Sequence, residues 1–304
     1  MNTLQHGQKE TILLTGATGY LGSNLLKALI KADRYTVIVL KRSFSNTFRI
    51  SEILDKVTVY DIDIVKPEEM FRDNKIDIIL HCATDYGRKN ASILQIIEAN
   101  LILPVMLLEL GRKYGAHCFV NTDTILDKRV NHYSLSKKQF KDWLFNYRND
   151  MVCANVALEH FYGPGDDKTK FVSFIVDSLL KKVEKLDLTK GEQKRDFIFI
   201  DDVVSAFLKI IDHAVAQGNG FYEFEVGTDQ AVTIKDLILM VKRLTNNEVT
   251  DLHFGALPYR DNEVMEGMAN SEAVRRLGWK PVHSLEHGLR LMIEQELQTI
   301  DQQV

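Results

Sequence analysis

The sequence predicts an α/β fold built on a doubly wound parallel sheet. Three observations lead to this prediction. Apolar runs of strand length alternate with helical patterns through the first half of the chain. The first of these runs leads directly into three glycines spaced three residues apart. An amphipathic helical pattern follows at once. A strand, a tight turn and a helix in this order open a sheet that binds its ligand at the carboxyl ends of the strands.

Length and composition limit the class of protein. A chain of 304 residues with 45% hydrophobic content can bury a large core. The net charge of −4 provides no overall basic field, so we expect a small-molecule partner and no nucleic acid. No apolar run reaches the roughly 18 to 20 residues of a membrane span, and residues 1–8 lack the apolar core of a secretory signal. We therefore expect no membrane association and a cytoplasmic location.

The three cysteines, Cys82, Cys118 and Cys153, show no paired spacing. They lie in or beside apolar stretches, which is typical of buried free thiols. We expect neither a disulfide nor a bound metal.

The elements of the first half follow from these local patterns. After the opening strand, strands are expected at 36–40, 57–62, 76–81, 118–122 and 151–157, with helices at 67–71, 93–114 and 137–148. In the second half, helices are expected at 171–182, 202–213, 234–244 and 285–297, with loops at 163–167 and 218–220. We expect a dinucleotide-binding domain over 1–162, to which 197–228 return, and a smaller, mainly helical substrate lobe over 163–304.

The glycine turn is the candidate phosphate-binding site. Glycine tolerates a positive φ and close backbone approach, and the free N–H groups of a helix start attract phosphate. A dinucleotide pyrophosphate is the expected ligand, although a surface turn is the alternative for this G-x-x-G-x-x-G spacing. The candidate residues are Gly16, Thr18, Gly19, Tyr20, Leu21 and Gly22.

The end of the second strand favours NADPH as the cofactor. Lys41, Arg42 and Ser43 stand where an enzyme specific for NAD commonly places an acid. Cationic side chains suit a 2′-phosphate because they pair with it through charge-assisted hydrogen bonds. A solvated basic loop is the alternative.

Two further strand ends are expected to line the cofactor. Asp61 and Asp63 end the third strand, and one of these carboxylates is the candidate acceptor for the adenine amino group. Asp63, followed by Ile64, is the favoured one, unless it is an ordinary turn carboxylate. The short side chains of Cys82, Ala83 and Thr84 would let the chain pass beneath the cofactor ribose.

The sharpest chemical signal is the pair Tyr133 and Lys137. Residues four apart on a helix share a face, so the ammonium can lie near the phenol oxygen. This proximity is expected to lower the pKa of the tyrosine from about 10 toward neutrality, where it can exchange a proton with a substrate oxygen.

Together these features resemble the extended short-chain dehydrogenase/reductase family, whose Rossmann-fold members are nucleotide-sugar epimerases, dehydratases and ketoreductases. The resemblance covers nearly the whole chain. It is carried by the segments 15–22, 98–100, 121–123, 133–137, 162–165, 195–197, 226–228 and 277–281.

The resemblance implies a role for each matching residue. Tyr133 would be the proton donor, Lys137 would bind the nicotinamide ribose and tune Tyr133, and Thr122 would polarise the substrate carbonyl. Asn100 would hold the active-site architecture. Arg195 and Arg260 match positions that pair with the substrate's pyrophosphate, although each could instead be a surface ion-pair partner.

Departures from the family pattern are informative. Sugar dehydratases carry Thr-Asp-Glu where this chain has Thr122, Asp123 and Thr124, so the base for elimination is missing. Asp123 is left to orient substrate or to cap a turn. His160 stands where family members often carry Asn, and it either contacts the hexose or fills the wall of the site.

More narrowly, segments 82–87, 121–124, 158–166, 191–199 and 260–263 resemble the CDP-abequose synthase group. Tyr86 lies in the first of these and is a further candidate substrate contact. The resemblance implies NADPH-dependent reduction of the 4-keto group of a CDP-linked 3,6-dideoxyhexose for O-antigen synthesis. It also implies a homodimer formed by the helices at 93–114 and 137–148, although their apolar side chains could instead pack against the sheet. The nucleobase and the stereochemistry at C4 stay undetermined.

Two other functions are open at this stage. A nucleotide-sugar 4-epimerase uses the same tyrosine but recycles a retained NAD, which Lys41 and Arg42 disfavour. An NADP-binding regulator without chemistry would have no need for Asn100, Thr122 and Tyr133.

Overall fold

The computed structural model describes residues 9–88 and 91–301, so the polar start at residues 1–8 lies outside the described part. The chain separates into two compact units. Unit 1 comprises Met1–Val156 and Phe207–Phe224, and unit 2 comprises Ala157–Ala206 and Glu225–Val304. Each unit is described by itself below.

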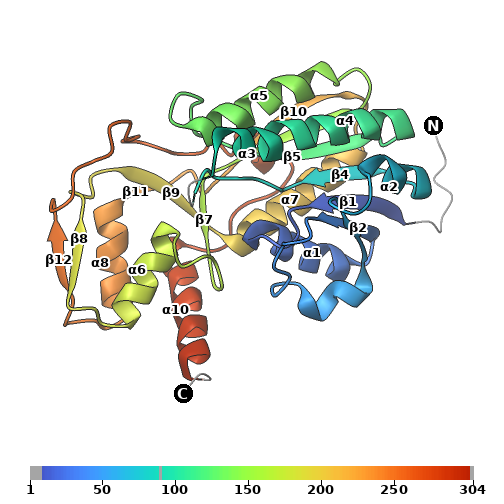
Figure 1. The fold of residues 1–304 in the computed structure, drawn as a ribbon. Helices are drawn as coiled ribbons and strands as arrows, with labels where there is room; N and C mark the ends of the chain where they lie inside the picture. The colour runs from blue at the N-terminus through green and yellow to red at the C-terminus, as the bar shows by residue number, and fades with distance from the viewer. Residues whose placement is uncertain (1–8, 89–90, 302–304) are drawn as a thin grey trace. The chain divides into compact units, whose positions relative to one another are not determined.

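Unit 1 is organised around a seven-stranded sheet in the order β10-β6-β5-β4-β1-β2-β3, so the doubly wound fold class is confirmed (Figure 1). β1 pairs in parallel with both β2 and β4, and β2–β3 and β4–β5 are also parallel. The order reverses beside β1, which is the point where such sheets bind ligands. The strands are β1 (Glu10–Thr15), β2 (Tyr35–Lys41), β3 (Thr58–Asp61), β4 (Ile78–His81), β5 (Cys118–Thr124), β6 (Val152–Leu158) and β10 (Gly220–Val226).

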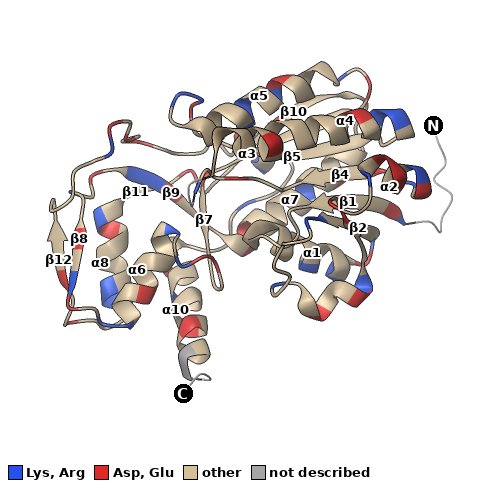
Figure 2. Cartoon of the chain, in the orientation of Figure 1, with Lys and Arg blue, Asp and Glu red and all other residues tan. Residues whose placement is uncertain are grey.

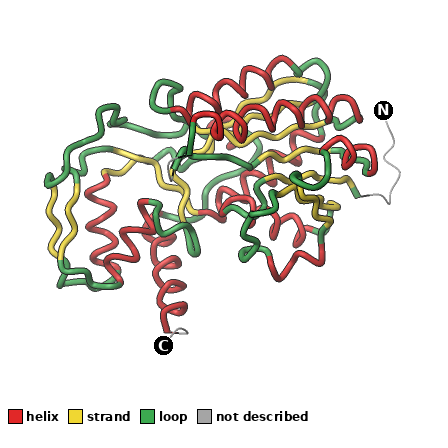
Figure 3. The backbone as a smooth tube through the Cα atoms, in the orientation of Figure 1, coloured by secondary structure: helices red, strands yellow, loops and turns green. Residues whose placement is uncertain are grey.

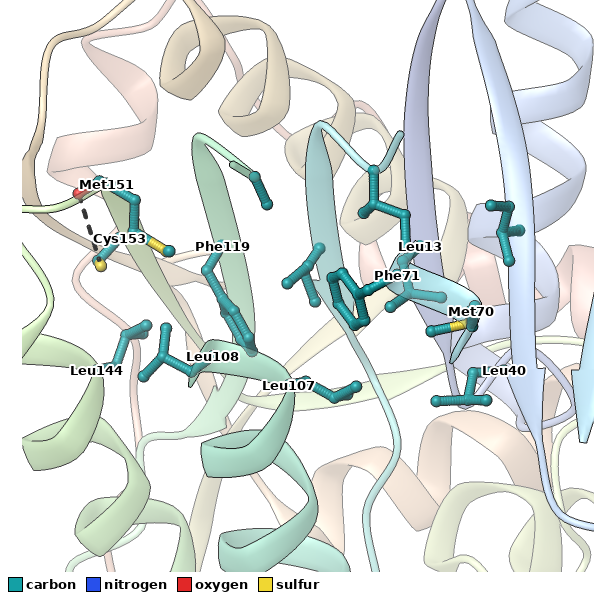
Figure 4. Close-up of a cluster of buried hydrophobic side chains, with 14 of the residues drawn as sticks. Leu13, Leu40, Met70, Phe71, Leu107, Leu108, Phe119, Leu144, Met151 and Cys153 are labelled. Carbon is teal, nitrogen blue, oxygen red and sulfur yellow. Dashed lines mark hydrogen bonds between the residues drawn. The ribbon is translucent and has the colours of Figure 1, made fainter. Parts of the chain in front are cut away.

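Helices cover both faces of this sheet because its strands alternate apolar side chains between them. Leu13 of β1 and Phe119 of β5 lie in one buried cluster with residues of α2, α4 and α5 (Figure 4). α1 packs on the opposite face (Figure 1). The helical segments of unit 1 are α1 (Tyr20–Ala32), η1 (Ser51–Lys56), α2 (Pro67–Asp73), α3 (Ile93–Ile97), η2 (Glu98–Ile102), α4 (Leu103–Tyr114) and α5 (His132–Asn146).

The expected helix at 137–148 begins earlier than predicted, at His132. Asn131 is the reason, because its side chain accepts the Ser134 amide while the Ser134 hydroxyl accepts the Asn131 amide. This capping box starts the helix ahead of the catalytic candidates. Tyr133 and Lys137 therefore share one continuous helix.

The expected helix at 93–114 is interrupted rather than uniform. η2 is a π-helical segment between α3 and α4, and it carries the buried Asn100. Such local widenings occur often at functional sites. Among the described residues, Ile93–Tyr114 is long and apolar enough to cross a membrane by length and composition, a test that core helices of soluble proteins also pass.

Unit 2 contains more strand than the sequence predicts. A three-stranded sheet has the order β11-β9-β7, and a two-stranded sheet pairs β12 with β8 (Figure 3). These strands have only three to six residues, too few for periodicity to reveal. Unit 2 holds β7 (His160–Tyr162), α6 (Phe171–Leu180), β8 (Lys185–Leu188), β9 (Lys194–Phe199), β11 (Ala231–Thr233), α8 (Ile234–Leu244), β12 (Asp251–Phe254), α9 (Glu272–Arg275) and α10 (Leu285–Asp301), while α7 (Ile200–Val215) runs from unit 2 into unit 1.

Candidate functional site

The glycine turn packs too tightly for any other residue type. Gly16 has a φ of +70°, and a Cβ on it would lie 2.5 Å from the Ala83 nitrogen. A Cβ on Gly22 would lie 2.1 Å from the Gly16 oxygen. The turn therefore joins the ends of β1 and β4 at backbone distance.

The start of α1 is built to receive an anion. Gly19 is the N-cap and its amide bonds to the Gly16 oxygen at 2.9 Å. Within the described residues no side chain caps this helix start, and its first turn carries no acid. The positive end of the helix is thus directed at the turn that holds the sequence-predicted Thr18, Tyr20 and Leu21.

The ends of β2 and β3 form one polar network. Lys41 Nζ lies 3.3 Å from Asp61 Oδ2, and the Ser43 amide donates to Asp63 Oδ2 at 2.8 Å. Desolvation raises the pKa of Asp61, but hydrogen bonds from Ser43, the Asp63 amide and Lys41 outweigh it and leave the pKa below its ordinary value. Lys41 therefore forms an ion pair with Asp61, which the sequence analysis did not predict.

The outer part of this network is more exposed. The Arg42 guanidinium lies over the Phe44 ring at 5.7 Å from the centroid. Phe44 and Ile64 are each 78% exposed. Arg42 thus lies against an exposed aromatic ring.

Asn100 ties the loop after β4 to helix α5. Its Oδ1 accepts the Asp85 amide at 2.7 Å and the Thr84 hydroxyl at 3.1 Å. Its Nδ2 donates to the Asp85 oxygen at 2.8 Å and to Ser136 Oγ at 3.0 Å. Three of these bonds hold the loop after β4, and the fourth joins it to the helix that carries Tyr133.

Lys137 is a buried amine with no partner. Its side chain is 1% exposed, and Nζ has no hydrogen-bond partner among the described residues. Desolvation lowers its pKa to about 8, although Asp123 and Cys82 act in the opposite direction. A buried donor of this kind can bond a ligand, and the ribose hydroxyls of a nicotinamide dinucleotide fit it because they accept hydrogen bonds.

His81 at the end of β4 is held neutral. Burial and the nearby Lys137 charge lower its pKa well below the ordinary value. Thr15 Oγ1 accepts the Cys82 and Ala83 amides, so it donates its own proton to His81 Nδ1 at 2.9 Å. Nε2 then carries the histidine proton and, within the described residues, is a buried donor without a partner.

The three cysteines are unpaired, as expected. Desolvation raises the pKa of Cys82 and of Cys153 to about 12 and that of Cys118 further still. These thiols are therefore protonated at neutral pH and weak nucleophiles.

The pKa of Tyr133 moves in the direction opposite to the sequence expectation. Desolvation raises it well above the ordinary value, and Tyr86 and Asp123 raise it further, while a hydrogen bond with the Thr124 side chain opposes them. The Tyr86 ring lies 5.0 Å from the Tyr133 ring, centroid to centroid. Burial dominates here because the phenolate loses its hydration. The phenol therefore stays protonated, which is the form a proton donor needs.

Thr122 and Asp123 are both buried at the end of β5. The Thr122 hydroxyl donates to the His81 oxygen at 3.0 Å. Asp123 accepts the Lys138 ammonium at 2.9 Å, Asn155 Nδ2 at 3.0 Å and the Thr124 amide at 2.7 Å. Three donors thus occupy the Asp123 carboxylate, so its predicted contact with substrate stays a prediction.

Arg195 in unit 2 is tied to a second acid. It lies on β9, beside Lys194 in a basic stretch that Figure 2 shows in blue. Its guanidinium is 2.8 Å from Glu263 Oε1, and both side chains are largely buried. Arg260, three residues before Glu263, is exposed. The sequence motif at 260–263 thus supplies the partner of Arg195.

Asp196 joins two of the quoted family segments. It is fully buried and accepts the Thr228 amide and hydroxyl and the Asp229 amide. A Cβ on Gly227 would lie 2.5 Å from Asp196 Oδ2. Asp196 therefore ties the segment at 195–197 to the segment at 226–228.

His160 begins β7, and its Nδ1 lies 2.5 Å from Glu159 Oε2. Its ring meets Phe197 edge-on at 5.8 Å. The imidazole is 43% exposed and the Glu159 side chain 2%.

Sequence reasoning did not find the pairings that hold the predicted residues in place. The partners are Asp61, Thr124, Lys138, Asn155, Glu159 and Glu263. Most of these residues pair with residues that are distant in the chain or lie across a turn, so no sequence spacing indicates the pairings. The immediate neighbours Glu159–His160 and Lys137–Lys138 were the only visible signals.

Comparison with known proteins identifies the family. Residues 12–227 match the NAD dependent epimerase/dehydratase family. The chain belongs to this family. The family is NAD-dependent, so its cofactor is a nicotinamide dinucleotide, and the sequence resemblance is confirmed.

Similarity to individual members extends over nearly the whole chain. The chain is 35% identical to a CDP-abequose synthase of Salmonella typhimurium over 94% of its length and 98% of the relative's. It is 27% identical to a UDP-glucose 4-epimerase of Mycolicibacterium smegmatis over 93% and 97%. Its fold is similar to that of the Thermotoga maritima UDP-glucose 4-epimerase with UDP-glucose, with a TM-score of 0.82 at 24% identity over 95% and 99% of the two chains.

Replacing Lys137 with methionine should stabilise the protein at neutral pH. The fall in the Lys137 pKa from 10.5 to about 8 corresponds to about 3 kcal/mol. The folded state binds fewer protons than the unfolded state between these values, so this cost is complete below pH 8 and disappears as the pH rises to 10.5. We expect Lys137→Met to be about 1 to 3 kcal/mol more stable at pH 7 and the difference to shrink by pH 10, measured by urea unfolding.

Lys138→Met is the matched control. It leaves the buried Asp123 carboxylate without its ammonium partner, so it should be destabilising at pH 7. A Lys137→Met protein less stable than the wild type at pH 7 would contradict the assignment of Lys137 as an uncompensated buried charge.

Proposed function

We propose that the protein is an NADPH-dependent reductase of the 4-keto group of a nucleotide-linked 3,6-dideoxyhexose. The nucleotide is CDP and the product is a CDP-abequose-like sugar for O-antigen synthesis. The observation that carries the proposal is the similarity to a CDP-abequose synthase over nearly the full length of both chains. The orphaned Lys137 amine, one helical turn after Tyr133, adds the chemical support.

The cofactor would be held by unit 1. The glycine turn and the start of α1 would bind the pyrophosphate, Lys137 the nicotinamide ribose, and Arg42 with Ser43 the 2′-phosphate. The strand ends at 63–64 and 82–84 would line the adenine and the ribose. When bound, the reduced nicotinamide supplies the hydride.

The residues of β5 and α5 would act on the substrate carbonyl. Tyr133 would donate to the C4 oxygen as negative charge grows there and would give up its proton. The Thr122 hydroxyl, which donates to the His81 oxygen in this structure, would turn to donate to the C4 oxygen as well. The Lys137 ammonium would stabilise the phenolate left behind. Asn100 would hold helix α5 and the loop after β4 in fixed positions during the reaction.

Unit 2 would contribute the nucleotide contacts. Arg195 and Arg260 would pair with the diphosphate, for which the Arg195 guanidinium would share its bonds with Glu263. Tyr86 and Asp123 of unit 1 are the further proposed substrate contacts. We place the enzyme in the cytoplasm, where its soluble nucleotide substrate would be available.

We also propose a homodimer that covers the apolar faces of α3, η2 and α5. Ile93, Leu94 and Ile102 are 51%, 76% and 48% exposed, and Trp143 and Phe145 of α5 are 50% and 44% exposed. Exposed apolar side chains at this density mark an association surface. Dimerisation of this face would also account for the apolar character of Ile93–Tyr114 without a membrane.

Tyr133→Phe should abolish reduction and leave cofactor binding intact. Loss of the phenol proton should lower kcat by about 10² to 10⁴-fold, because no other donor replaces it. Stopped-flow NADPH oxidation and fluorescence titration of NADPH measure the two effects. Tyr114→Phe, whose hydroxyl bonds Glu68, is the control and should keep full activity. Unchanged turnover of the Tyr133→Phe protein would remove Tyr133 from the mechanism.

Arg42→Glu should weaken the binding of NADPH more than the binding of NADH. A lost charge-assisted contact with the 2′-phosphate should raise the Kd of NADPH about 10 to 100-fold, while that of NADH changes less than about threefold. Lys27→Glu on the exposed side of α1 makes the same change in net charge and should alter neither. Equal weakening of both cofactors by Arg42→Glu would defeat the 2′-phosphate assignment.

Leu94→Glu should convert the dimer into a monomer. A carboxylate buried in an apolar contact lacks the hydration that stabilises it, so association should weaken by at least tenfold. Sedimentation velocity at micromolar concentration measures the fraction of dimer. Leu239→Glu, at an exposed position of α8, is the control. A wild-type protein that sediments as a monomer would rule out the proposed dimer.

A further inference from the structure

The pair Glu159 and His160 forms a fixed hydrogen-bonding unit in unit 2. A single oxygen, Glu159 Oε2, accepts the His160 amide at 3.0 Å and lies 2.5 Å from His160 Nδ1. A carboxylate can only accept, so the histidine proton is on Nδ1. In the neutral ring Nε2 is then left as an acceptor on the exposed end of the side chain.

The Glu159 carboxylate lies against the backbone of Gly267. A Cβ built on this glycine would be 2.7 Å from Glu159 Oε1 and 3.6 Å from Arg195 Cδ. The Glu159 carboxylate and the stem of Arg195 thus meet at Gly267, and the hydrogen bond from Nδ1 to Glu159 sets the tautomer of His160.

The register of the three-stranded sheet places His160 and Arg195 on one face. β7 pairs in parallel with β9, with His160 opposite Phe197, and the two rings are in contact. Arg195 precedes Phe197 by two residues, so its side chain points to the same face. Strand geometry separates the two Cα atoms by roughly 8 Å.

We propose that His160 Nε2 accepts a hydrogen bond from the C2 hydroxyl of the sugar and that Glu159 is its positioning residue. The inference rests on the proposed function, in which Arg195 binds the diphosphate. A 3,6-dideoxy-4-ketohexose joined to phosphate through C1 retains one hydroxyl, on C2. That carbon adjoins the phosphate-bearing C1, so its hydroxyl is the sugar donor nearest to Arg195. A fixed acceptor beside Arg195 therefore selects the sugar by this group.

Calorimetric binding of a CDP-linked 3,6-dideoxyhexose and of its 2-deoxy analogue tests the proposal. The wild type should bind the 2-deoxy analogue about 3 to 10-fold more weakly, as expected for one lost hydrogen bond. His160→Phe keeps a ring against Phe197 but has no acceptor, so it should bind the two ligands equally. Glu159→Met should reduce the discrimination although His160 is still present, which a structural role of Glu159 would not do. Melting temperatures and NADPH binding report that each variant is folded.

His253→Phe is the matched control, because His253 is 38% exposed and bonds to Asp251 at 2.5 Å on the two-stranded sheet. It should retain the wild-type discrimination. Equal binding of both ligands by the wild type, or discrimination that survives in His160→Phe, would overturn the proposal. If the His160→Phe protein lost affinity for CDP alone as much as for the CDP-linked sugar, the histidine would contact the phosphate instead of the sugar. Because binding needs no turnover, this result is separate from the proposed function, which fails if the wild type reduces no nucleotide-linked 4-ketosugar.

Discussion

The arrangement of unit 1 depends on one buried amine. Lys137 Nζ is withdrawn from water and has no partner in the described part of the chain; desolvation lowers its pKa to about 8 and costs folding free energy. Such a cost is retained where the group serves a ligand. Around it, Asn100 fixes the β4 loop to α5, and His81 stays neutral, so neither compensates the charge. The site is therefore prepared for a polar ligand at this point.

A second pattern concerns the acids that bond to the predicted residues or their neighbours. In unit 1 Asp61 and Asp123 bond to Lys41 and Lys138, and in unit 2 Glu263 bonds to Arg195. Glu159 instead holds a histidine. These pairs fix the orientation of side chains that would otherwise be mobile, at the expense of their availability to a ligand. Asp123 shows the consequence most clearly, because its three donors leave it poorly suited to act as a free acid for elimination.

The sequence predicted the parts whose signals are local. The β1 run, the glycine turn and the amphipathic α1 pattern predicted the sheet, and Tyr133 with Lys137 needed only helical spacing. The short strands β7 and β11 were not predicted, because three residues are too few to show an alternating pattern. The direction of the Tyr133 pKa was wrong because spacing reveals a neighbouring charge but not the burial that outweighs it. Pairings such as Arg195 with Glu263 are tertiary, and no local pattern encodes them.

The central claim is that this site carries out a net reduction of a sugar carbonyl. The most direct test is to incubate the wild type with NADPH and CDP-, dTDP- and GDP-linked 4-ketosugars and to follow cofactor oxidation together with the NMR spectrum of the product. The account predicts one NADPH oxidised for each new C4 hydroxyl, with the CDP-linked 3,6-dideoxy sugar preferred. Conversion of a nucleotide sugar without added NADPH and without release of oxidised cofactor would contradict it and identify a 4-epimerase.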